Sequence, residues 1–99
     1  MTDYDSALNM PYNAWVRRQA AIKRIPSNEL ERILEITQLR VEGNGWTLSR
    51  LRAIEKFNKL ASGYDAITDL QEKPTDFLRF LGFSIVTSYI ISGTAIREK

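Results

Sequence analysis

The side chains of this 99-residue sequence that could do chemistry are poorly suited to catalysis. Histidine and cysteine are both absent, which removes the usual general base, the usual transition-metal ligands and every Ser-His or Cys-His nucleophile pair. Glu31 and Glu35 are four residues apart and would lie on one face of a helix. That face is expected to be exposed to water, so the pKa of neither carboxyl need shift. Gly43-Asn44-Gly45 lacks the lysine and hydroxyl of a phosphate-binding loop. We therefore expect a protein that is not an enzyme, with no catalytic residue, cofactor or metal site.

Basic side chains form two groups, and these are the candidate binding residues. The first group, near Tyr12 and Trp15, consists of Arg17, Arg18, Lys23 and Arg24. Basic residues beside aromatic ones can bind nucleic acid or an acidic groove on a protein, and a planar guanidinium suits carboxylates. The alternative is a solvated helix face with its aromatic residues buried.

The second basic group lies further along the chain and consists of Arg50, Arg52, Lys56 and Lys59. The last three share one helical face, at spacings of four and three residues. An expected helix and a glycine turn precede this group, a layout that resembles a helix-turn-helix protein, whose second helix enters the DNA major groove. Two features argue against nucleic-acid binding. The preceding helix is acidic, and Glu55 could pair with Lys59 on an ordinary solvated helix face.

Composition indicates one small globular domain, with 43% hydrophobic and 26% charged residues. The net charge of +2 is small, although basic and acidic segments alternate along the chain. The sequence has no signal-peptide pattern and no cysteine framework, so we expect a cytoplasmic protein. Residues 1–10 are polar and aperiodic and predict a flexible N-terminal tail, followed by a single helical domain over 11–99.

Turn and capping residues predict where the first helices begin and end. Pro11 opens a helix that Pro26 ends. Asn28 and Glu31 form a capping box for a helix over 28–42, which the glycines at 43 and 45 stop. Trp46 has the spacing of a hydrophobic staple before a helix over 47–62, so we expect it to pack rather than to bind a ligand. Helices 28–42 and 47–62 would then form a central helical hairpin.

The C-terminal third, residues 77–96, is the most apolar part of the chain. After a short helix within 64–73, we expect an apolar helix over 75–92 to be the centre of an all-α bundle of four to five helices. One alternative is a β-hairpin over 83–96, because residues 84–91 are rich in β-branched side chains and Ser92-Gly93 could turn. Another is a membrane anchor over the uncharged run 80–96, which approaches a spanning length.

These features together predict a small accessory or regulatory protein that binds a larger protein, as an adaptor or an inhibitor. Phage and plasmid regulators of their hosts commonly have this size and composition, which is an analogy of kind only. The two basic groups are the candidate partner-binding surfaces. Nucleic-acid binding through 47–62 and membrane association through 80–96 are the alternatives, and the wide apolar stripes could also support a homo-oligomer.

Overall fold

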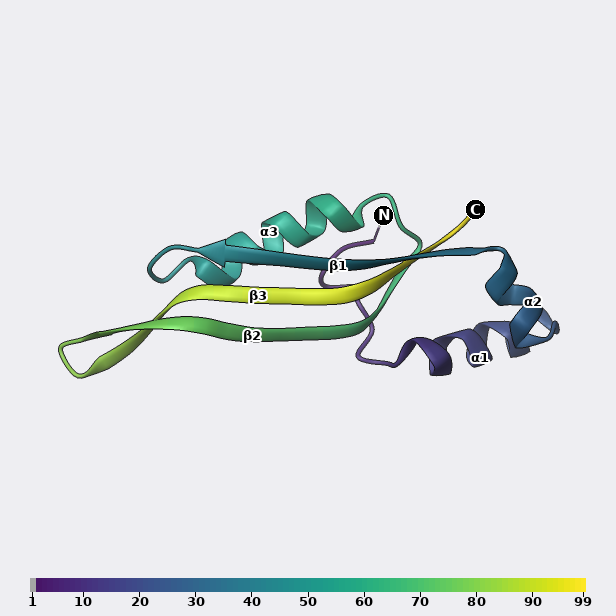
Figure 1. The fold of residues 1–99 in the computed structure, drawn as a ribbon, viewed down its shortest axis with the longest axis horizontal. Coiled ribbons are helices and arrows are strands. Elements are labelled where there is room, and N and C mark those ends of the chain that lie inside the picture. Colours follow the sequence, from purple (N-terminus) through teal and green to yellow (C-terminus); the bar gives the residue numbers. More distant parts are fainter. Residues whose placement is uncertain (1) are drawn as a thin grey trace.

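A three-stranded antiparallel sheet with helices at its faces forms the described part of the chain, residues 2–99 of the computed structural model (Figure 1). The strands lie in the order β1-β3-β2, so β3 is central. In chain order the elements are α1 (Tyr12–Lys23), α2 (Ser27–Arg32), β1 (Leu34–Asn44), α3 (Ser49–Ala61), β2 (Ala66–Phe80) and β3 (Phe83–Glu98).

The prediction of an all-α bundle is wrong, and residues 28–42 show why. This segment divides into the short helix α2 and most of strand β1, which pairs with β3 from Leu34↔Glu98 to Asn44↔Ser88. Its apolar residues fit both a helical and a strand period. The strand is stabilised by a partner far away in sequence, which a local pattern cannot reveal. The central helical hairpin therefore does not exist.

The helices expected over 64–73 and 75–92 are also wrong, because these residues belong to β2 and β3. The alternative of a β-hairpin over 83–96 is correct in its strand structure but wrong as a hairpin, because Phe83–Glu98 is one continuous strand. The turn lies elsewhere: the hairpin reverses at Leu81-Gly82, while Ser92-Gly93 sits inside β3. Register shifts near Asp69 and Asp76 bend β2 along its length.

Helix α3 confirms the helix expected over 47–62, with slightly tighter bounds, and it connects the two outer strands across the sheet. Strands β1 and β2 are parallel to each other with β3 between them, so β1-α3-β2 is a split β-α-β unit. The side chains at every fourth position of α3 are buried against the sheet; they are Ser49, Ala53, Phe57 and Ala61. The approach is close, since a Cβ on Gly43 would lie 2.1 Å from the Ser49 carbonyl oxygen.

Two hydrophobic clusters lie on opposite faces of the sheet. Leu39, Val41 and Ile91 pack with Phe57 beneath α3. Leu34 and Ile96 occupy positions of the opposite alternation, and they pack with residues of α1 and α2. The predicted first helix is thus confirmed as α1, and with α2 it covers only one end of that second face (Figure 1). No helix within residues 2–99 has the length and apolarity needed to cross a bilayer.

Candidate functional site

The β2–β3 hairpin extends beyond the end of β1 and forms one end of a molecule that measures 58 × 21 × 17 Å (Figure 1). Strand β1 makes its last pair with β3 at Ser88. The hairpin residues beyond that point, 76–86, are here called the finger. At its apex Phe80 pairs with Phe83, and Leu81-Gly82 form a two-residue turn with φ angles of 50° and 83°. Positive φ at both positions is the geometry of a type I′ turn.

Large apolar side chains on the finger are exposed to solvent. The exposed fractions are 56% for Phe77, 41% for Leu78, 52% for Phe80, 80% for Leu81 and 72% for Phe83. Trp46, in the loop after β1, is 58% exposed and contacts the Phe80 ring edge-on at 6.3 Å between centroids. Contiguous exposed apolar surface of this kind marks an interaction site in a soluble protein.

The finger is apolar on both of its faces. The register places Leu78 beside Ile85 and Phe80 beside Phe83, and strand alternation puts these two pairs on one face. Phe77 and Val86 are paired on the other face. The only charged side chains in the finger are Asp76 and Arg79. A partner that covers the whole finger must therefore surround it rather than lie flat against one side.

Leu81 occupies an unfavourable backbone conformation at the apex. A φ of 50° is uncommon for a bulky residue, and type I′ turns usually take Asn, Asp or Gly at this position. Local strain of this kind costs about 1–3 kcal/mol and is concentrated at functional positions. The most exposed leucine of the finger is thus held where asparagine would be more stable.

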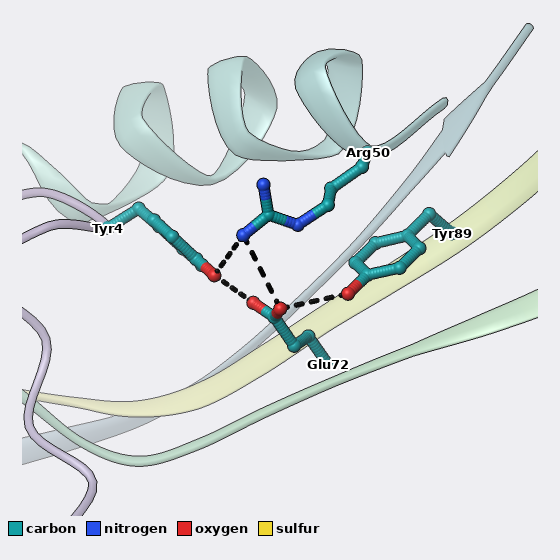
Figure 2. A network of polar contacts seen from close by, with 4 residues as sticks. All are labelled: Tyr4, Arg50, Glu72 and Tyr89. Carbon is teal, nitrogen blue, oxygen red and sulfur yellow. Dashed lines mark hydrogen bonds and ion pairs between the residues drawn. The ribbon is translucent and has the colours of Figure 1, made fainter. Parts of the chain in front are cut away.

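A polar network joins the base of the hairpin to the N-terminal segment and to α3 (Figure 2). The Glu72 carboxylate accepts hydrogen bonds from the Tyr4 hydroxyl and, at 2.9 Å, from the Tyr89 hydroxyl. Arg50 Nη2 lies 3.5 Å from Glu72 Oε1 and donates to the Tyr4 hydroxyl at 2.9 Å. The N-terminal segment, α3 and both strands of the hairpin meet at this one carboxylate.

The network fixes the protonation states of its members. Burial alone would raise the Glu72 pKa, but the hydrogen bonds from Tyr4 and Tyr89 and the charge of Arg50 outweigh it, so the pKa lies below its usual range. Burial raises the pKa of Tyr4 and of Tyr89, and the bonds to Glu72 raise both further. The carboxylate is ionised and already engaged by donors, which makes it a structural link rather than a free general base.

The N-terminal segment makes further contacts with the sheet and with α3. The Leu8 amide donates to the Ile67 carbonyl, and the Asp69 amide donates to the Met10 carbonyl, both at 2.9 Å. The Tyr4 amide donates to Asn58 Oδ1 at 2.7 Å. The flexibility expected for residues 1–10 stays a prediction; Tyr4, Leu8 and Met10 bond to the rest of the fold, and Met1 lies outside the described residues.

The first predicted basic group lies on α1, where its side chains are exposed. Lys23 Nζ pairs with Glu98 Oε1 at 3.1 Å. Arg24 ends the helix in a left-handed conformation, with a φ of 59°. Arg17 and Arg18 form no ion pair within residues 2–99. This group lies apart from the second basic group, because α1 and α3 pack on opposite faces of the sheet.

The second predicted basic group lies on α3, and three of its members are engaged. Arg50 belongs to the network around Glu72. Arg52 Nη1 donates to the Asn44 carbonyl at 2.9 Å, and Lys56 Nζ donates to the Glu42 carbonyl at 2.8 Å. Lys59 remains exposed near the end of the helix. The helix-turn-helix layout proposed for this group is not formed, because the segment before α3 is strand β1.

Sequence reasoning missed the finger, because it assigned those residues to a buried core and Trp46 to a packing role. Trp46 does pack, against Phe80, but it lies on the exposed finger side and not in a core. A usable signal was present: Leu81-Gly82 lies between two phenylalanines, and β-branched residues follow.

Comparisons with models of known families, with curated proteins and with solved structures find no match.

Proposed function

We propose that this protein is a non-enzymatic binding module of the cytoplasm that docks on a larger protein by inserting the finger into an apolar cleft. The single observation behind the proposal is the set of exposed apolar side chains at the finger apex and at Trp46. Aromatic residues of this kind dominate interface energetics when a partner desolvates them. A paired hairpin with a two-residue turn is already ordered, which lowers the entropic cost of binding.

Charge favours a protein partner over a membrane or a nucleic acid. Residues 66–98, which contain the hairpin, carry four acidic and three basic side chains. A surface that binds anionic lipid or phosphate would need a clear basic excess. Strand addition is also disfavoured at the finger's own strand β2, where Pro74 and two bulges interrupt the free edge. Burial of the apex side chains is therefore favoured over strand addition at the β2 edge.

Affinity capture tests the proposal directly. The tagged protein, a Phe80→Ser/Phe83→Ser double variant and an Ile22→Ser/Leu51→Ser double variant are expressed in the source organism, and captured proteins are quantified by mass spectrometry. Ile22 and Leu51 are matched controls, being 66% and 52% exposed and outside the finger. We expect one dominant partner with the parent and with the control, and its loss with the finger variant.

Titration of the purified partner then fixes the size of the effect. Losing two interface aromatics should weaken binding about 1,000-fold, because hot-spot residues contribute about 2 kcal/mol or more each. Equal capture by the finger variant would contradict the proposal. Finger-dependent flotation with anionic vesicles, in the absence of a protein partner, would replace it with membrane binding.

A further inference from the structure

The two outer edges of the sheet differ in how they are protected from other strands. The β2 edge is covered at Ile67 and Asp69 by backbone bonds from the N-terminal segment. Beyond that cover, Pro74 lacks an amide hydrogen, and bulges disrupt the pairing on both sides of it. These are the devices by which proteins prevent an edge strand from recruiting another strand.

The β1 edge has none of these devices over residues 36–41. Its register with β3 runs without a shift from Leu34 to Asn44, and it contains no proline. The Gly45 amide donates to the Thr87 carbonyl, so odd-numbered residues of β1 bond to β3 and even-numbered ones point their backbone groups outward. Among the described residues, no backbone or side-chain hydrogen bond reaches these outward groups at Ile36, Gln38 or Arg40.

The end of the free stretch is marked by two side chains of α3. Lys56 and Arg52 donate to the outward carbonyls of Glu42 and Asn44 at 2.8 and 2.9 Å. Those two carbonyls are therefore satisfied within the chain. The unprotected part of the edge ends at Glu42, and an added strand would cover Ile36 to Val41.

A groove of about 560 Å³ lies where this edge meets α3, and its lining is basic around an apolar centre. Leu60, half exposed, and Val41 supply apolar surface. Lys56 and Lys59 supply positive charge from α3, and Lys59 forms no ion pair within residues 2–99. Arg40 also forms none there, and strand alternation puts its side chain on the opposite, open face of β1. The carboxylate of Glu42 is occupied by a hydrogen bond from Ser88 at 2.7 Å.

Charge also argues against a second copy of this chain as the occupant. Antiparallel pairing of two β1 edges would place the two α3 helices side by side on the same face of a continuous sheet. Each α3 carries four basic residues and one acidic residue, a net charge of +3. Their repulsion disfavours the dimer, whereas an acidic segment would be attracted.

We propose that the β1 edge is a second interaction site, which adds an extended acidic segment of a partner protein as a fourth strand. Residues of the segment opposite Leu39 and Val41 face α3 and are apolar, since they meet Leu60. Residues opposite Gln38 and Arg40 face the open side of the sheet, and glutamate or aspartate there pairs with Arg40. This site is independent of the finger and does not rest on its function.

A designed probe tests the site without knowledge of the natural partner. The probe is a capped hexapeptide of alternating valine and glutamate, added to the full-length protein, and amide hydrogen exchange is followed by NMR. At ten times the dissociation constant, the Gln38 and Arg40 amides should exchange about tenfold more slowly. A hexapeptide of alternating valine and lysine should give no protection.

Three variants connect the effect to the edge. Gln38→Pro removes an outward amide that β3 does not use, so the fold should persist while protection is lost. Arg40→Glu should weaken the probe about fivefold, and Arg17→Glu, which has the same charge change on α1, should leave its binding unchanged.

Three results would overturn the inference. One is unchanged exchange of the Gln38 and Arg40 amides at millimolar probe. Another is protection that grows with protein concentration alone, which would assign the edge to a second copy. The third is equal protection by the basic peptide or by duplex DNA, which would remove the acidic segment as the preferred occupant.

Discussion

The two halves of β3 form one continuous strand in opposite surroundings. In residues 83–90, five of eight residues are hydrophobic, against three of eight in residues 91–98. Yet Phe83 is 72% exposed, while Ile91 and Ala95 are fully buried. The more apolar half is the more exposed one, because its residues 83–86 lie beyond the end of β1 and have only β2 beside them.

This contrast shows that apolar sequence does not by itself identify a core. Burial in this fold depends on which strands and helices reach a given position. The second half of β3 has a strand on each side and α3 above it, whereas the first half has β2 alone over the finger. A two-stranded hairpin is marginal in water, so the exposed apolar residues of the finger are better explained by binding than by folding.

The largest expected difference between the two regions comes from removing a phenylalanine in each. Phe57→Ala should lower the free energy of unfolding by about 3–5 kcal/mol, because a fully buried ring leaves a cavity beneath α3. Phe83→Ala should change it by no more than about 0.5 kcal/mol, since an exposed ring packs little. Urea denaturation followed by circular dichroism measures both. Equal losses would mean that the finger is part of the cooperative core.

The contact between α3 and β1 can be tested by adding a single methyl group. Gly43→Ala should cost about 3 kcal/mol, because its Cβ would lie 2.1 Å from the Ser49 oxygen and 2.4 Å from the Ala53 nitrogen. Backbone atoms of a helix cannot yield as a side-chain end can. Gly63→Ala is the matched control, with its nearest neighbour at 4.0 Å, and should be neutral in the same urea titration. A stable Gly43→Ala protein would show that α3 can move away from β1.

Helices α1 and α3 could be predicted from sequence, because their signals are local. Pro11 and Pro26 delimit the first, and the glycines before Trp46 separate the second from what precedes it. The strands could not be predicted in this way, because β1 pairs with residues more than 40 positions away in the sequence. Pro74 did carry a strand-compatible signal, because proline is tolerated at a sheet edge, but it also fits the end of a helix.

The candidate sites were less predictable than the fold. The basic residues of α3 were identified by type and spacing, yet their engagement with β1 carbonyls depends on a sheet that the sequence pattern did not reveal. The finger residues were recognised as apolar, but their exposure follows from where β1 stops at Asn44. Such an endpoint is set by tertiary structure and leaves no mark on residues 76–86 themselves.

A substitution at the finger apex should separate stability from binding. Leu81→Asn should raise the free energy of unfolding by about 0.5–1 kcal/mol, because asparagine tolerates the positive φ of a type I′ turn. The same change should weaken capture of the partner, since it removes the most exposed apolar side chain. Gly82→Ala, at a φ of 83°, should instead lower stability. If Leu81→Asn were destabilising, the apex would be packed rather than displayed.

The smallest expected effect concerns the network that lies between the buried half of the hairpin and the finger. Because the Glu72 pKa is lowered in the folded protein, its contribution is fully present above the ordinary carboxyl pKa, about 4.3. It is lost as the pH falls through the folded value. Tyr4 and Tyr89 have raised pKa values, so their contribution is present below about pH 10 and lost above it.

Unfolding free energies measured across pH for the parent and for Glu72→Gln isolate this contribution. The difference between the two proteins should be about 0.5 kcal/mol at pH 7, a partly exposed group being screened by solvent, and should shrink below pH 4. Tyr4→Phe should reduce the same acid dependence, because it removes one donor to the carboxylate. Parallel pH curves for parent and Glu72→Gln would show that the finger is anchored by strand pairing alone, without help from the N-terminal segment.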